Sequence, residues 1–288
     1  MGIREKGYYR WEGELNAKGF TWFPIFLRGI KHAFRKKYAK ALFGFAGMPF
    51  LVFLVALYVS TKPELKMLSR LVRLLQNDAE FFNVFYSNGL LTFIFLVLCI
   101  FIGAELISGD YKSNAFPLYF SRPLNPRDYI MGKFSVLLFY LLLFSLVPGV
   151  LLVIFKLLFT GAFSFDIGLF GALIVYPLFV ALFFTSFTLL VSSLTANRKF
   201  VAAAIFLVYV FSNAIAEILR AIFKDPVFEL ASIEKNIQQT GAWLFGVDPP
   251  ISIPAVYSAL ILCLSTGLMV GVIFRKIKRA EAQIENGG

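Results

Sequence analysis

Six long apolar runs, separated by short polar stretches, dominate the pattern of this sequence. A helix needs about 20 apolar residues, each rising about 1.5 Å, to cross the hydrocarbon core of a bilayer. We therefore predict an all-α integral membrane protein with six transmembrane helices. Pro148 and Pro177 lie inside the third and fourth runs, where we expect kinks. The six predicted spans are roughly 41–60, 88–107, 130–155, 167–195, 200–219 and 253–274.

A different pattern precedes the first run. In residues 20–40, apolar side chains recur at helical spacing and basic side chains fill the positions between them. This pattern predicts an amphipathic helix at the lipid interface, with its basic face toward anionic head groups. A soluble helix on a partner protein is the alternative. The apolar positions are Phe23, Phe26, Leu27, Ile30 and Phe34, and the basic ones are Arg28, Lys31, Arg35 and Lys36.

Composition and charge support a membrane protein and argue against a nucleic-acid partner. The chain is 59% hydrophobic and 16% charged, with a net charge of +11. Its Lys and Arg residues flank the apolar runs and do not form one basic patch. Basic residues mark the cytoplasmic side of a membrane protein. We therefore expect both termini in the cytoplasm of a cell-membrane protein. Residues 1–40 would form a tail and interfacial helix, 41–274 the six-span domain, and 275–288 a basic tail.

The two longer loops on the other side predict further structure. Leucines at helical spacing in residues 62–76 predict a short helix on the outer surface. Residues 220–252 are too apolar for an ordinary loop and too interrupted for a span. We expect either a re-entrant or interfacial element that caps a pathway, or a packed external loop. Cys99 and Cys263 each fall inside a predicted span, where small apolar packing is expected and a disulfide framework is not.

Motifs for chemistry on this chain are missing from the sequence. It has no GxxxxGK[ST] phosphate loop, no HExxH and no CxxC. We therefore expect no catalytic site, metal or cofactor on this chain. The single histidine, His32, cannot form a metal site alone and is expected on an exposed polar face. Glu217 is a weak candidate for contact with a substrate. Gly267 and Gly271 form a GxxxG pattern that favours close helix approach, within the chain or between chains.

The segment between the second and third spans, residues 108–129, is more elaborate than a linker requires. The region around it carries four basic residues, an aromatic face and two prolines that stop a helix. Such a surface is suited to docking a cytoplasmic partner. The basic residues are Lys112, Arg122, Arg127 and Lys133.

This block resembles the membrane subunits of type-2 ATP-binding cassette transporters. The resemblance rests on Gly109-Asp110 after the second span, the stretch from Phe116 to Pro123, and Gly132-Lys133 in the third span. It implies a short coupling helix that seats in a separate ATPase subunit, an elbow helix before the first span, and a second permease subunit, identical or different. ATP and Mg would be bound by the ATPase. Pro117 departs from the family pattern, so the helix is expected to start near Phe116.

The resemblance also implies residue roles. Five residues would contact the ATPase, namely Phe116, Leu118, Tyr119, Phe120 and Arg122. Five more would have structural or coupling roles near the cytoplasmic face, namely Glu105, Gly109, Asp110, Gly132 and Lys133.

These expectations favour a transport permease, most readily an exporter. A membrane anchor whose ATPase does mechanical or signalling work is the alternative, and an intramembrane enzyme is a third possibility. The abundance of Phe, at 35 residues, suits a lipid-like or drug-like cargo, but it suits ordinary packing against lipid equally well.

Overall fold

The fold is a bundle of long helices. The computed structural model describes residues 20–36, 39–60, 77–120, 124–161 and 166–286, and none of these residues lies in a β-strand. Six helical stretches in this described part are long and apolar enough to cross a membrane. They confirm the predicted all-α protein with six transmembrane helices. Their bounds are Lys40–Val59, Asp78–Lys112, Pro126–Thr160, Ile167–Leu194, Arg198–Phe223 and Ala255–Gln283.

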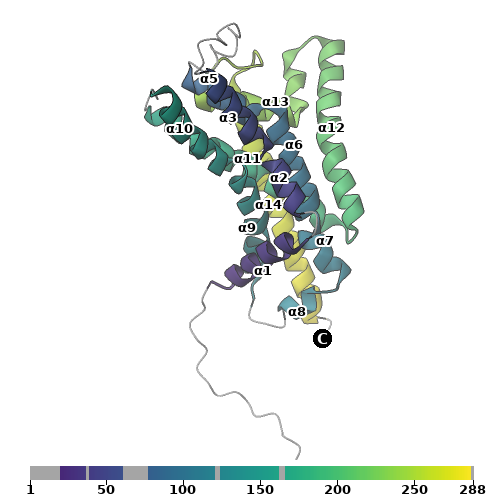
Figure 1. Ribbon diagram of the computed structural model, residues 1–288. Coiled ribbons are helices and arrows are strands. Elements are labelled where there is room, and N and C mark those ends of the chain that lie inside the picture. The colour runs from purple at the N-terminus through teal and green to yellow at the C-terminus, as the bar shows by residue number, and fades with distance from the viewer. Residues whose placement is uncertain (1–19, 37–38, 61–76, 121–123, 162–165, 287–288) are drawn as a thin grey trace, which may run out of the picture.

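The six stretches alternate in direction between two ends of the bundle (Figure 1). One end carries α1 (Trp22–Arg35), the short helix α8 (Phe116–Phe120) and the last turns of α14 (Ala255–Asn286). We call it the α8 end. The other carries α5 (Asp78–Ser87), the last turns of α10 (Leu146–Thr160) and α13 (Ile233–Phe245). We call it the α13 end.

The first two stretches are each built from several helices. Gly47 separates α2 (Ala39–Ala46) from α3 (Met48–Ser60). In the second stretch, the extended backbone of Asn88 separates α5 from α6, and its side chain caps α6 by accepting from the Leu91 N–H at 2.8 Å. The span predicted at residue 88 therefore begins where α6 begins. The stretch continues as α6 (Gly89–Leu98), a π-helical segment η2 (Cys99–Gly103) and α7 (Glu105–Lys112).

The two proline-containing stretches differ in continuity. The third is divided at Phe144 and Ser145 into α9 (Pro126–Leu143) and α10, and Pro148 lies in the first turn of α10. Because proline has no N–H, it cannot donate back to the preceding turn, and the helix is interrupted there. The fourth, α11 (Ile167–Leu194), remains one helix with Pro177 inside it. A break therefore accompanies the proline in one of the two expected places.

The remaining elements close the α13 end. After α12 (Arg198–Phe223) the chain forms the 3₁₀ helix η3 (Pro226–Ala231) and then α13, which packs against α14, α11 and α5. The region predicted as re-entrant or packed thus contains a helix packed on the bundle. Residues 275–286, predicted as a tail, continue α14. The outer helix predicted at 62–76 lies outside the described residues.

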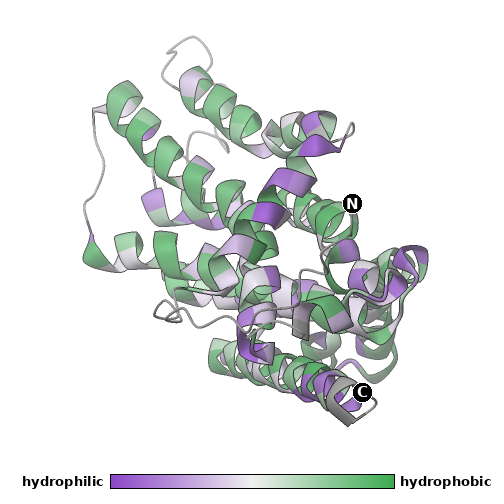
Figure 2. Ribbon diagram, turned by 90° about the horizontal axis from the view of Figure 1, so that it is seen from below, coloured by the Kyte–Doolittle hydropathy of each residue, from purple (hydrophilic) through white to green (hydrophobic). Residues whose placement is uncertain are grey.

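The hydrophobic core surrounds α11, which contacts α14, α9, α7, α12 and α13. Aromatic side chains fill much of it, and the largest fully buried ones include Tyr129, Tyr140, Tyr176 and Phe184. The helices around the bundle are also predominantly hydrophobic on their outer faces (Figure 2). A helix that is apolar on all sides is typical of a protein whose solvent is lipid.

Candidate functional site

The short helix α8 is connected to α7 by a tight turn at the α8 end. Asn114 adopts a left-handed conformation with φ of 49°, and the Ala115 N–H donates to the Asp110 carbonyl at 2.9 Å. Asparagine is among the residues that tolerate this conformation. The turn ends α7 and lets α8 begin at Phe116, as the sequence predicts.

Aromatic side chains form the base of α8. The ring of Phe116 is 4.6 Å from that of Tyr111 and 5.5 Å from that of Tyr129, between centroids. Tyr119 packs on Tyr129 at 5.2 Å. Phe116 is only 5% exposed, whereas Leu118 is 74% exposed. Within this chain the ring of Phe116 therefore supports α8, and Leu118 lies on the surface; the contact of Phe116 with a partner stays a prediction.

A partly buried polar group lies next to these rings. Asp110 accepts a hydrogen bond from the Tyr129 hydroxyl at 2.6 Å and pairs with the Lys133 ammonium at 2.6 Å. The Lys133 ammonium also lies 5.7 Å from the ring centroid of Tyr119. Charge-assisted hydrogen bonds of this kind are stronger than neutral ones. They join α7 to α9 directly below α8, so the three elements are held together.

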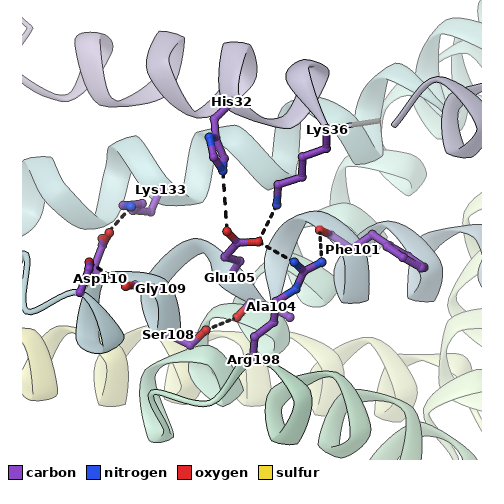
Figure 3. A network of polar contacts seen from close by, with 11 residues as sticks. His32, Lys36, Phe101, Ala104, Glu105, Ser108, Gly109, Asp110, Lys133 and Arg198 are labelled. Atoms are coloured by element: carbon purple, nitrogen blue, oxygen red, sulfur yellow. Dashed lines mark hydrogen bonds and ion pairs between the residues drawn. The ribbon is translucent and has the colours of Figure 1, made fainter. Parts of the chain in front are cut away.

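Glu105 organises a second group of charges (Figure 3). Its carboxylate lies 2.6 Å from Lys36 Nζ, 2.8 Å from Arg198 Nη1 and 3.7 Å from His32 Nε2. These partners belong to α1, to the residue that ends it, and to the start of α12. Arg198 also donates to the Phe101 carbonyl at 3.3 Å. One carboxylate thus connects α7 to two other helices.

His32 fits its predicted position and adds a contact that was not predicted. Its side chain is 66% exposed, in agreement with a polar-face residue, yet it approaches Glu105. The two are 73 residues apart in the chain, and no spacing rule connects them.

Ser192 of α11 is a positioning residue that the sequence analysis did not identify. Its hydroxyl accepts from the Ile107 and Ser108 N–H groups at 3.2 and 3.0 Å and donates to the Ala104 carbonyl at 2.9 Å. These backbone groups follow the π-helical segment, where the regular α-helical pattern is disturbed. A fully buried serine therefore fixes the start of α7 to the centre of the bundle. In the sequence, the one sign of this role is a serine within an apolar run.

Gly132 allows α1 to pack directly on α9. A Cβ at this position would lie 2.7 Å from Ile25 Cβ and 2.9 Å from the Trp22 carbonyl oxygen, distances that real Cβ atoms do not adopt. A Cβ added at Gly29 of α1 would lie even closer to Val136 Cγ2 of α9. Part of the apolar face of the amphipathic helix is therefore covered by α9, while Phe23, Leu27 and Phe34 remain exposed.

A groove of about 1060 Å³ runs between α1, α7 and α8. Basic side chains from α1 and acidic ones from α7 face each other across it, and Gly109 and Leu118 also line it. A Cβ added at Gly109 would lie 3.3 Å from Glu105 Cγ, so a larger residue there would crowd the Glu105 side chain. The candidate site is thus a charged surface at one end of the bundle.

Some predicted residues lie elsewhere. The side chain of Phe120 and all of Arg122 are outside the described residues. Glu217 is on the exposed face of α12, away from the core. Added Cβ atoms at Gly267 and Gly271 would meet nothing within 4 Å, so these glycines do not serve close packing among the described residues. No group of three potential metal ligands occurs within the described ranges.

Comparison with known families agrees with this arrangement. A model described as ABC-2 family transporter protein matches residues 36–281, which include the first five long helices, nearly all of the sixth, α8, and every residue of the two polar groups except His32. No curated protein matches the chain.

Proposed function

We propose a function from the premise that this chain belongs to the ABC-2 family of transporter proteins, whose model covers most of its length. The chain is a multi-pass membrane component of transport. We propose that it is the permease subunit of an exporter in the cell membrane, with both termini in the cytoplasm. A separate ABC ATPase would bind ATP and Mg, and a second permease subunit would complete the pathway.

The observation that carries this proposal is the construction of α8. Phe116 is buried against neighbouring aromatic rings, and Asp110 joins α7 to α9 next to them through Tyr129 and Lys133. Leu118, by contrast, is exposed at the end of the molecule. An element that only connected two spans would need no such support. A rigid element with an exposed apolar tip is what a partner that pushes on the chain requires, because a flexible one would absorb the displacement.

The contacts around α8 define a route for movement. A displacement of α8 would reach α7 and α9 together through the Asp110–Lys133 pair. It would then reach α11 through Ser192, and α1 and α12 through Glu105. Packed helices move as rigid units, so a small shift at a docking surface becomes a rearrangement of whole elements. Binding and release of nucleotide on the ATPase would thus change access to the pathway.

Binding of the ATPase subunit tests this proposal. The chain is expressed with its cognate ABC ATPase, and retention of the ATPase through purification in detergent is measured. Leu118→Asp places a charge on the exposed tip of α8 and is expected to reduce retention strongly, since buried charges at the centre of an interface are unfavourable. ATP hydrolysis by the complex should decrease in parallel.

The matched control is Ala196→Asp, which adds the same charge at an exposed position in the turn between α11 and α12, at the same end. It should leave retention unchanged. Equal retention by wild type and both variants would contradict the docking role of α8, and a wild-type chain that binds no ABC ATPase would contradict the proposed function.

A further inference from the structure

The last helix continues well beyond the length that a bilayer requires. α14 has 32 residues, so at about 1.5 Å per residue it is about 48 Å long, against about 30 Å for the hydrocarbon core. The change from apolar to basic sequence occurs near Phe274. We call residues 274–286 the α14 extension. About 18 Å of helix therefore lies on the far side of the hydrocarbon core, beside α8 (Figure 1).

The α14 extension is packed against the elements that hold α8. Ile273 and Ile277, one turn apart, are fully buried in the core. α14 contacts both α8 and α9, and the Arg127 guanidinium of α9 lies 5.9 Å from the ring centroid of Phe274. A helical extension with a buried apolar stripe is a fixed part of the fold.

Besides the direct contact between α14 and α8, side chains connect the extension to α8 through Tyr111. The Lys276 ammonium lies 5.8 Å from the ring centroid of Tyr111, and that ring is 4.6 Å from Phe116. Phe116 in turn packs on Tyr129 of α9. Together with α7 and α9, the extension therefore packs around the residues that support α8.

The opposite face of the extension is basic and exposed. Arg275, Lys278 and Arg279 all have exposed side chains, while the buried stripe faces the bundle. Lys112 and Arg127, close to the two ends of the α8 segment, are exposed as well. The α14 extension and the two segments that flank α8 in the sequence thus all carry exposed basic residues.

We propose that the α14 extension is a second docking element for the ATPase subunit and that it recognises an acidic surface on that partner. The inference rests on the proposed function, because it takes the ATPase to be the protein that approaches α8. Charges at the edge of an interface mainly steer association and fix its register. The α14 extension would orient the ATPase while Leu118 enters its groove.

The position of the basic face favours a protein partner over lipid head groups. Lys278 and Arg279 lie beyond Ile277, more than one turn past the end of the apolar sequence, on the helix that contacts α8. Lys40 and Lys199, by contrast, begin the first and fifth spans, where head groups are expected.

Charge reversal distinguishes these two groups of residues. The test variant is Lys278→Glu with Arg279→Glu, and the matched control is Lys40→Glu with Lys199→Glu, which reverses two exposed charges at the same end. Affinity for the purified ATPase is measured in lipid nanodiscs over a range of salt concentrations. The test variant should bind about tenfold more weakly with a flatter salt dependence, and the control should stay near wild type.

The outcomes separate failure of the role proposed for the α14 extension from failure of the proposed function. Equal binding by the test variant and wild type overturns the role of the α14 extension and leaves the proposed function intact. Equal weakening in both variants also overturns it, because net charge alone would then explain the effect. A wild-type chain that does not bind the ATPase overturns both proposals.

Crosslinking provides a second measurement that does not depend on charge reversal. The chain has two cysteines, of which Cys99 is buried and Cys263 is exposed. In a Cys263→Ala background, Lys278→Cys carrying a thiol-linked photocrosslinker should capture the ATPase, and Lys199→Cys should not. Capture from Lys199 alone would contradict the proposed position of the partner.

Discussion

Two groups of charged residues, Glu105 with its partners at the α8 end and Lys156 with Asp78 at the α13 end, differ in burial and in number of partners. At the α8 end, Glu105 is shared by three basic side chains and remains about one-third exposed. At the α13 end, Lys156 pairs with Asp78, and the two side chains are only 3% and 10% exposed. The Lys156 ammonium also lies 4.9 Å from the ring centroid of Phe81, in apolar surroundings.

This difference indicates different mechanical properties. A carboxylate with several partners and access to solvent can lose one partner and retain the others, so the contacts of Glu105 can tolerate local change. A buried pair has little access to solvent, and breaking it exposes a charge to an apolar environment. We therefore expect the buried pair at the α13 end to resist rearrangement and the contacts of Glu105 at the α8 end to accept it.

Removing the lysine of the buried pair should have the largest effect. Lys156→Met keeps the length of the side chain and deprives Asp78 of its ammonium partner, which is expected to lower the free energy of unfolding by about 3–5 kcal/mol. Thermal unfolding in detergent measures the loss.

The double variant Lys156→Met with Asp78→Asn provides the control. It replaces the ion pair with neutral groups, so much of the lost stability should return. A single variant as stable as wild type would show that the α13 end does not depend on this pair.

Filling the space at Gly132 should have an intermediate effect. Gly132→Val introduces atoms where Ile25 and the Trp22 carbonyl already lie, so α1 must move away from α9. Overpacking of this kind costs about 1–3 kcal/mol. The measurement is thermal unfolding together with crosslinking between cysteines placed on α1 and α9.

Gly44, where an added Cβ would meet nothing within 4 Å, is the matched position. Gly44→Val should change stability much less. If the two valine variants were equally stable, close packing of α1 on α9 would not contribute to the stability of the protein.

Changes to the shared charges should have the smallest effects on stability. Glu105→Gln removes the charge but keeps an oxygen acceptor, and because the site is partly exposed the expected loss is about 1 kcal/mol. His32→Ala removes a partner that is 3.7 Å away and mostly exposed, so its effect should be close to zero. A double-mutant cycle for Glu105 and Lys36 would measure their coupling directly. A coupling as large as that of the buried pair would remove the contrast between the two ends.

The helices could be predicted from the sequence because lipid imposes a simple rule on each span. Apolar length alone located all six, and helical spacing located α1. The rule fails where polar residues begin a helix: α5 begins with Asp78 and has Glu80 in its first turn, and it lies outside the span predicted at 88–107. Its N-terminal acids are nevertheless well placed, because Asn77 caps the helix and negative charges favour that end.

The candidate site was only partly predictable for a different reason. The resemblance located α8 and pointed to Glu105, Asp110 and Lys133, but their partners come from segments distant in the chain. The contacts of Glu105 with His32 and Arg198, and of Ser192 with the start of α7, depend on how helices pack. Exposure likewise depends on packing, so the sequence did not distinguish the buried ring of Phe116 from the exposed side chain of Leu118.

The most direct test of the account is the side of the membrane on which Leu118 lies. Leu118→Cys in a Cys263→Ala background is treated with a membrane-impermeant maleimide, in intact cells and in inside-out vesicles. We predict labelling in the vesicles, protection when the ATPase is bound, and no labelling in intact cells. Labelling from outside intact cells would contradict the account, because no ATPase in the cytoplasm could then reach α8.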